Sequence, residues 1–107
     1  MKHLLLLLSF LLLSSPLFGQ ETGVLYQYET SSGLVWKTFG DGKVQPKYKG
    51  EIKNGKPNGF GFQTYKNGNK YFGSWKNGEI WNGTEYDNYG NIIYRWVEGK
   101  RKYHNLL

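Results

Sequence analysis

The sequence contains no cysteine, one methionine and three prolines among its 107 residues. Without cysteine, the chain can form neither a disulfide framework nor a thiolate-ligated metal site. It also has only two histidines, and its eight acidic residues are scattered without the spacing of a metal site. A chain of this length has room for about one small domain, which excludes a multidomain enzyme.

The sequence also has little helical character, because no segment shows a sustained helical repeat of apolar residues with capping signals. The last ten residues, 98–107, are the one stretch in which a helix is allowed. The chain has instead 15 glycines and an aromatic content of 18%. So many rings argue against disorder, and rings combined with glycines are typical of short strands joined by tight turns.

Residues 1–19 have the order of regions that is typical of a secretory signal peptide. A short basic start is followed by an apolar run at Leu4–Leu13 and a small-residue exit at Ser14–Gly19. The run is half as long as the roughly 20 residues of a membrane-spanning helix. We therefore expect a signal-peptide helix over 1–19, cleavage after Gly19 and export to the periplasm or beyond; retention as a membrane anchor is the alternative. A domain over 20–107 would remain.

The charge balance is basic, with 14 Lys and Arg against 8 Asp and Glu and a formal net charge of +6. Removing residues 1–19 takes away one lysine and leaves a net charge of +5. Such a balance favours nucleic acid, anionic lipid or an acidic polymer as a partner. Because an exported protein rarely meets nucleic acid, we expect no nucleic-acid partner.

An internal repeat organises the chain. The segment from Tyr48, YKGEIKNGK, is echoed 23 residues later by YFGSWKNGE from Tyr71, and Tyr94 follows after another 23. A fixed period of this length indicates a repeat array. We assign two clear repeats, at 48–70 and 71–93, and two partial ones, at about 26–47 and 94–100.

Each repeat has a strand pattern of period two. Tyr48, Gly50 and Ile52 alternate with charged residues, which predicts a strand with one buried and one polar face. The Asn-Gly pairs at 54–55 and 77–78 supply the positive φ that tight hairpin turns require. We predict strands near residues 24–30, 34–39, 44–53, 59–65, 70–76, 83–87 and 91–97.

This pattern, Tyr-x-Gly-x-Trp-x-Asn-Gly followed by a Gly-x-Gly strand, resembles the MORN (membrane occupation and recognition nexus) repeat. The second copy matches it throughout, whereas the first has Ile52 in place of the tryptophan and the third has Trp96 in place of the glycine. The resemblance implies an all-β fold, a single-layer antiparallel meander of stacked β-hairpins, with scaffolding, protein-binding or membrane-surface roles and no catalytic residues. The repeat-defining residues are Tyr48, Gly50, Asn54, Gly55, Gly59, Gly61, Tyr71, Gly73, Asn77, Gly78 and Gly83.

Neither catalysis nor cofactor binding is expected. Nucleophilic catalysis needs several converging groups, and the chain has no motif that supplies them. His104 lies in a basic tail, and the acidic residues mostly fall in predicted turns or on polar strand faces. We predict a non-enzyme without metal or cofactor.

The aromatic residues allow two interpretations. In a single-layer sheet they pack on one another across strands as a core, or they form an exposed face that binds peptide or glycan. Trp81, in a predicted turn, is the ring expected to be most exposed. The candidate interaction surface comprises Trp36, Phe60, Phe62, Trp75, Trp81, Trp96, Lys49, Lys53 and Lys76.

The function predicted from the sequence is an exported, non-catalytic repeat module that acts as a protein-interaction or structural scaffold in the cell envelope. An envelope protein is the expected partner, bound by a curved surface of rings and lysines or by strand addition at a sheet edge. The alternatives are a carbohydrate or cell-wall-binding module and peripheral binding to an anionic membrane surface. The oligomeric state stays open.

Overall fold

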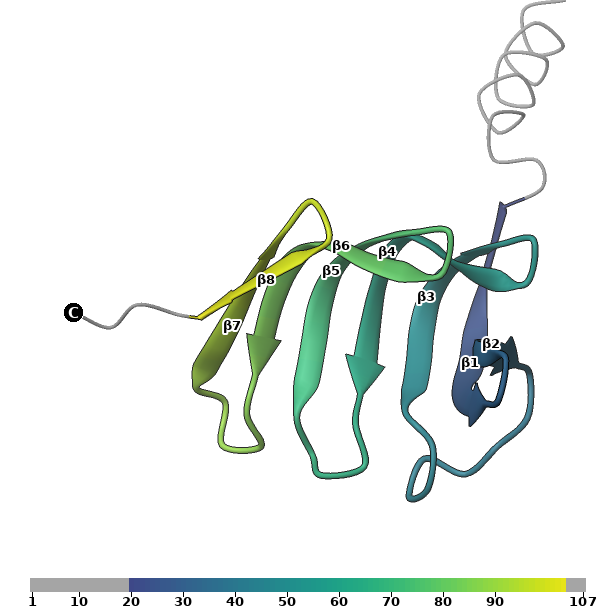
Figure 1. Cartoon of the computed structure of the whole chain (residues 1–107), viewed down its shortest axis with the longest axis horizontal. Coiled ribbons are helices and arrows are strands. Elements are labelled where there is room, and N and C mark those ends of the chain that lie inside the picture. Colours follow the sequence, from purple (N-terminus) through teal and green to yellow (C-terminus); the bar gives the residue numbers. More distant parts are fainter. Residues whose placement is uncertain (1–19, 104–107) are drawn as a thin grey trace, which may run out of the picture.

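The computed structural model describes residues 20–103, which form one antiparallel sheet of eight strands (Figure 1). The spatial order is β2-β1-β3-β4-β5-β6-β7-β8, which confirms the predicted all-β, single-layer antiparallel meander, with one exception: β1 lies between β2 and β3. No helix among these residues is long and apolar enough to cross a membrane, and the predicted signal peptide lies outside them. The strands are β1 (Gln20–Thr30), β2 (Gly33–Lys37), β3 (Lys47–Lys53), β4 (Lys56–Thr64), β5 (Lys70–Lys76), β6 (Glu79–Tyr86), β7 (Ile92–Val97) and β8 (Lys100–Tyr103).

Three of the predicted strands begin too late, and the first of them, predicted near 24–30, starts at Gln20. β4 and β6 start at Lys56 and Glu79, directly after the turns, because a two-residue turn lets strand pairing resume at once. Trp81, predicted in a turn, therefore lies inside β6. The helix allowed over 98–107 is also wrong, since Lys100–Tyr103 pair with β7 as an eighth strand.

The hairpin turns have the predicted conformation. Asn54 and Gly55 have φ values of 54° and 74°, and Asn77 and Gly78 have values of 50° and 86°. Two consecutive residues with positive φ are typical of the type I′ turn, whose twist matches that of the flanking strands. The degenerate third copy keeps the same turn at residues 98–99, with φ values of 49° and 80°.

The second and third of these turns are also tied to the preceding hairpin. The Asn77 amide donates to the side-chain oxygen of Asn58 at 3.0 Å, and the Glu98 amide donates to that of Asn82 at 2.8 Å. A backbone bond from the Gly78 amide to the Pro57 carbonyl, at 2.8 Å, accompanies the first of these. These bonds fix how successive hairpins stack.

A row of glycines crosses five strands. The register aligns Gly23, Gly50, Gly61, Gly73 and Gly83 on β1, β3, β4, β5 and β6. A Cβ atom at Gly61 would lie 2.1 Å from a ring carbon of Tyr48, and one at Gly83 would lie 2.5 Å from the Tyr71 hydroxyl. The repeat tyrosines thus lie flat over backbone that only glycine leaves open.

The same tyrosines stabilise a bulge in each repeat. The register shifts between Gly50 and Ile52 and between Gly73 and Trp75. At these points the Tyr48 hydroxyl donates to the Glu51 carbonyl at 2.5 Å, and the Tyr71 hydroxyl donates to the Ser74 carbonyl at 2.9 Å. Because bulges bend strands, the hairpin ends curl over and the sheet becomes a half-barrel, as Figure 1 shows.

The buried core lies on the concave face. The Trp75 ring meets Tyr48 at 5.1 Å, Tyr71 at 5.4 Å and Trp36 at 5.8 Å between centroids, each edge to face. Ring pairs in this geometry contribute more than their buried area alone. The large residues that flank the repeat glycines therefore share one face, as predicted.

Of the two interpretations of the rings, packing in the core does not hold for Phe60 and Phe62. Strand alternation places them on the convex face of β4, since Gly61 and Gln63 take the concave positions. Phe72 on β5 joins them, with its ring 6.3 Å from that of Phe62.

The glycine row provides a test of this account. Replacing Gly61 with alanine should lower the free energy of unfolding by at least about 2 kcal/mol, because the new methyl group overlaps the Tyr48 ring. Gly42→Ala is the matched control, since its Cβ would lie 3.8 Å from the nearest side chain and should change stability by less than about 0.5 kcal/mol. Urea unfolding followed by tryptophan fluorescence gives both values. Equal losses in the two variants would contradict the proposed role of the row.

Candidate interaction groove

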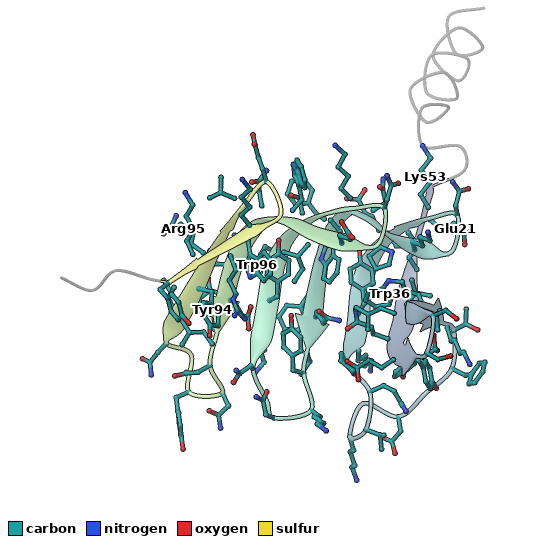
Figure 2. The ribbon with its side chains drawn as sticks, viewed as in Figure 1. Glu21, Trp36, Lys53, Tyr94, Arg95 and Trp96 are labelled. Atoms are coloured by element: carbon teal, nitrogen blue, oxygen red, sulfur yellow. The ribbon has the colours of Figure 1, made fainter. Side chains whose placement is uncertain are left out.

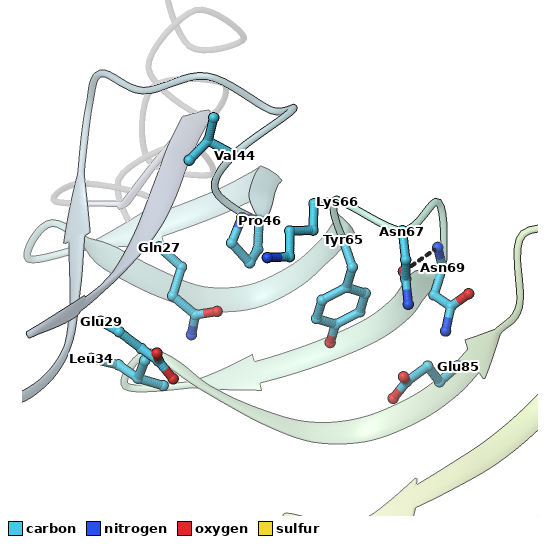
Figure 3. Close-up of a pocket in the computed structure, with 10 residues that line it drawn as sticks. All are labelled: Gln27, Glu29, Leu34, Val44, Pro46, Tyr65, Lys66, Asn67, Asn69 and Glu85. Carbon is cyan, nitrogen blue, oxygen red and sulfur yellow. Dashed lines mark hydrogen bonds between the residues drawn. The ribbon is translucent and has the colours of Figure 1, made fainter.

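The concave face contains two adjoining hollows, of about 500 and 360 Å³, which both border on Gln27, Leu34 and Tyr65. Figure 3 shows the larger one. Their walls come from strands between β2 and β7, so the hollow space runs across the strands and not along them. We call this space the groove and define it by Gln27, Gln63, Tyr65, Trp75, Glu85 and Trp96.

The sheet register builds the floor of the groove. Tyr48, Gln63, Tyr71 and Glu85 are paired in one cross-strand row from β3 to β6. Rings and polar groups alternate along this row, and Gln63 and Glu85 are only 2% and 8% exposed. The Gln63 amide donates to the side-chain oxygen of Gln27 at 3.4 Å. Buried carboxamides that both donate and accept therefore lie beside the hollow.

Glu85 places a carboxylate among the rings. Its side chain accepts a hydrogen bond from the Trp96 indole nitrogen at 3.0 Å. Burial of a carboxylate is costly unless hydrogen bonds or opposite charges compensate it. The larger hollow therefore contains a buried carboxylate, Glu85, beside Tyr65, in addition to the exposed Glu29.

The nearby tyrosines remain neutral at physiological pH. Burial raises the pKa of Tyr71 to about 12, and the charge of Glu85 adds to the effect while a hydrogen bond with the Trp81 backbone opposes it. Burial likewise raises the pKa of Tyr48 and of Tyr65, with contributions from Glu51 and Glu85 respectively. These hydroxyls can act as hydrogen-bond donors but not as bases near neutral pH.

Trp75 adds an unsatisfied donor to the wall. Its indole nitrogen is buried and has no hydrogen-bond partner among the residues that the structure describes. Trp75 borders the smaller hollow. A hydrogen-bond acceptor of a ligand that entered this hollow could therefore accept a hydrogen bond from the Trp75 indole nitrogen.

The convex face carries a second distinct surface. Phe60 and Phe72 are 68% and 59% exposed, far more than rings in a protein core. One cross-strand row contains, in order, Lys49, Phe62, Phe72, Thr84 and Arg95, so Lys49 is next to Phe62 whereas Thr84 separates Phe72 from Arg95. We call Phe60, Phe62, Phe72, Lys49 and Arg95 the convex patch.

The nine candidate residues from the sequence do not form one surface. Trp36 and Trp96 lie on the concave side towards opposite ends of the sheet (Figure 2), and Trp75 belongs to the core between them. Trp81 is half-buried, with the Lys76 ammonium 4.5 Å from its ring, and is not the most exposed ring. The others split between the convex face, with Phe60, Phe62 and Lys49, and the hairpin end of β3, with Lys53.

The sequence pattern of rings and lysines did not predict four residues of the groove, namely Gln27, Gln63, Tyr65 and Glu85. A signal existed, because Gln63 and Glu85 each follow a row glycine by two residues and must share its face. For metals, no group of three His, Cys, Asp or Glu side chains within residues 20–103 could hold an ion.

Comparison with known proteins finds a similarity to one protein family. The family model described as MORN repeat matches residues 48–70 and 71–81, which confirms the resemblance inferred from the sequence. The first match has the bounds expected, whereas the second ends at residue 81 and not at 93. No curated protein and no solved structure matches the chain. MORN repeats are modules for protein or membrane interaction and are generally non-catalytic.

The buried tyrosines predict a loss of stability at alkaline pH. An unfolded tyrosine ionises near pH 10, whereas Tyr71 holds its proton to about pH 12. Between these values the unfolded chain binds fewer protons than the folded one, so the free energy of unfolding falls as pH rises. Urea unfolding at intervals from pH 8 to pH 11 measures this slope. Tyr71→Phe should make it shallower, and a Tyr89→Phe control, at an exposed loop position, should leave it unchanged. The reverse ranking of the two variants would refute the assignment.

Proposed function

We propose that this chain is an exported, non-catalytic interaction module whose groove binds a protein of the cell envelope. The observation that carries the proposal is the groove itself, a concave space that crosses the sheet and has rings and carboxamides in its walls. Binding sites typically combine apolar walls with a few polar groups that fix orientation.

The chemistry of the walls suits a polypeptide. A glutamine amide offers a donor and an acceptor at the spacing of a peptide group, and Gln27 and Gln63 place two such amides side by side. Aromatic side chains such as Trp75 and Trp96 are the kind enriched at the centres of protein interfaces. The MORN repeats at 48–81 support the same class of role.

The location rests on the amino-terminal segment. The basic start, apolar run and small-residue exit of residues 1–19 support export, and an exported module meets its partners in the envelope or outside the cell. The tied hairpins support a scaffold role, because they would hold the groove in one shape.

Site-specific photo-cross-linking tests this proposal. A photoreactive amino acid is placed at Leu34, which borders both hollows and is 58% exposed, and separately at Phe72, which is equally exposed on the convex face. After irradiation of cells that produce each variant, the Leu34 variant should form a discrete cross-link to one envelope protein. The Phe72 variant should not form it.

The outcomes separate the alternatives. An envelope protein captured from Phe72 and not from Leu34 would place the interaction on the wrong face and overturn the proposal. Products with polysaccharide would support the carbohydrate-binding alternative instead. Recovery of the chain in the cytoplasmic fraction would remove the exported part of the proposal.

A second function, peripheral binding to an anionic membrane surface, is favoured by the convex patch. Exposed rings flanked by cations are the features that attract a protein to an anionic bilayer. Lys49 supplies a charge directly beside Phe62, and Arg95 supplies one two strands away from Phe72.

Co-sedimentation with vesicles of anionic and neutral lipid tests this second function. Phe60→Ser/Phe72→Ser should lower partitioning into anionic vesicles about tenfold, since two apolar side chains no longer insert. Phe39→Ser/Tyr89→Ser removes two exposed rings outside the patch and should have little effect. Binding that is unchanged in the first variant, or equal for neutral vesicles, would rule the patch out.

A further inference from the structure

We infer that the groove selects a partner segment that carries a lysine or arginine, whose charged group pairs with Glu85. This inference rests on the proposed function, because it specifies the chemistry of the protein that the groove binds. It starts from a carboxylate that the fold buries without giving it an opposite charge.

Glu85 is 8% exposed and borders the larger hollow beside Tyr65 (Figure 3). Within residues 20–103 its hydrogen-bond partner is the neutral Trp96 indole, at 3.0 Å, and no ion pair accompanies it. A carboxylate has room for about four hydrogen bonds. A charged donor from outside would fill this capacity, and such a bond is stronger than one between neutral groups.

The surroundings of Glu85 favour a long cationic side chain. The Trp96 ring, which donates to Glu85, borders the smaller hollow, and Tyr65 borders both hollows. Aromatic walls accommodate the alkyl stem of lysine or arginine, and ring faces attract the charged end. Both parts of such a side chain would therefore find complementary surface.

No cation within residues 20–103 forms an ion pair with Glu85, although Arg101 lies on the same face, against Tyr94, which is the cross-strand partner of Glu85. The Arg101 guanidinium lies over the Tyr94 ring at 4.1 Å, and the Lys76 ammonium lies over Trp81 at 4.5 Å. Lys66 borders the larger hollow but forms no ion pair with Glu85. Glu85 thus keeps hydrogen-bonding capacity that a charged donor of a partner can fill.

The carboxamides identify the occupant as a polypeptide. Gln27 and Gln63 can bond to the peptide groups on either side of the basic residue. A free small cation would leave these amides, and the rest of a hollow of about 500 Å³, without contact.

Side-chain mimics test the inference without a partner protein. The full chain is titrated with n-butylguanidinium, which mimics arginine, and with n-butylurea, its uncharged isostere, while NMR follows the indole N–H signals of the tryptophans. The cation should shift the Trp96 signal saturably and bind about tenfold more tightly than the urea, because only the cation pairs with Glu85.

Variants locate the effect. Glu85→Gln should abolish the preference for the cation, whereas Glu21→Gln removes the same charge from an exposed position on β1 and should preserve it. Equal binding of the two probes by the unmodified chain would overturn the inference even if Glu85→Gln failed to fold. Retention of the preference in a folded Glu85→Gln protein would overturn it as well.

The result is separable from that of the cross-linking experiment. A protein cross-link at Leu34 together with equal binding of both probes would keep the proposed function and reject the role of Glu85. A cation preference without any protein cross-link would reject the envelope partner and keep Glu85 as a cation site.

Discussion

The close approach of a tyrosine ring to a row of glycines is the constraint on which this molecule depends. Tyr48 and Tyr71 can reach the carbonyls of their bulges only by crossing Gly61 and Gly83, where any side chain would block them. The ring, the glycine and the bulge are therefore one unit. Each unit bends its hairpin in the same sense, and repetition of the bend converts a flat ribbon into a half-barrel. Curvature here is a property of the repeat and not of any single strand.

The bend gives the two faces of the sheet different surfaces. On the concave side the rings converge on Trp75 and leave a groove beside the core, whereas on the convex side Phe60 of β4 and Phe72 of β5 remain exposed. A single-layer sheet has no second layer to cover either face. The exposed phenylalanines are therefore better explained as a surface for contact than as part of the core, since burying them among the core rings would require a one-residue shift of register.

Much of the fold could be predicted, because its signals are local. The Asn-Gly turns, the alternation around Gly50 and Gly73 and the period of 23 residues all lie within short windows of sequence. The groove could not be predicted from the sequence, because it depends on which residues of distant strands face each other. Gln63 and Glu85 look like ordinary polar residues until the register places them beside Tyr71. The eighth strand was missed because KRKY has the composition of a solvated tail, and only pairing with β7 orders it.

The third copy departs from the repeat pattern at a residue that borders the groove. Trp96 pairs with Gly83 and so occupies the place in the row that glycine holds on the preceding strands. No tyrosine can lie across this position, and Tyr94 packs instead against Tyr103, with ring centroids 5.2 Å apart. The bend unit is lost, and the indole gained in its place closes one end of the groove and donates to Glu85. This departure from the repeat removes a bending unit from the array. It also supplies a wall of the groove and a hydrogen bond to the one buried carboxylate of the described residues. Random loss of the repeat pattern alone does not explain both gains. The departure is the change expected if the groove is the feature that the array exists to present.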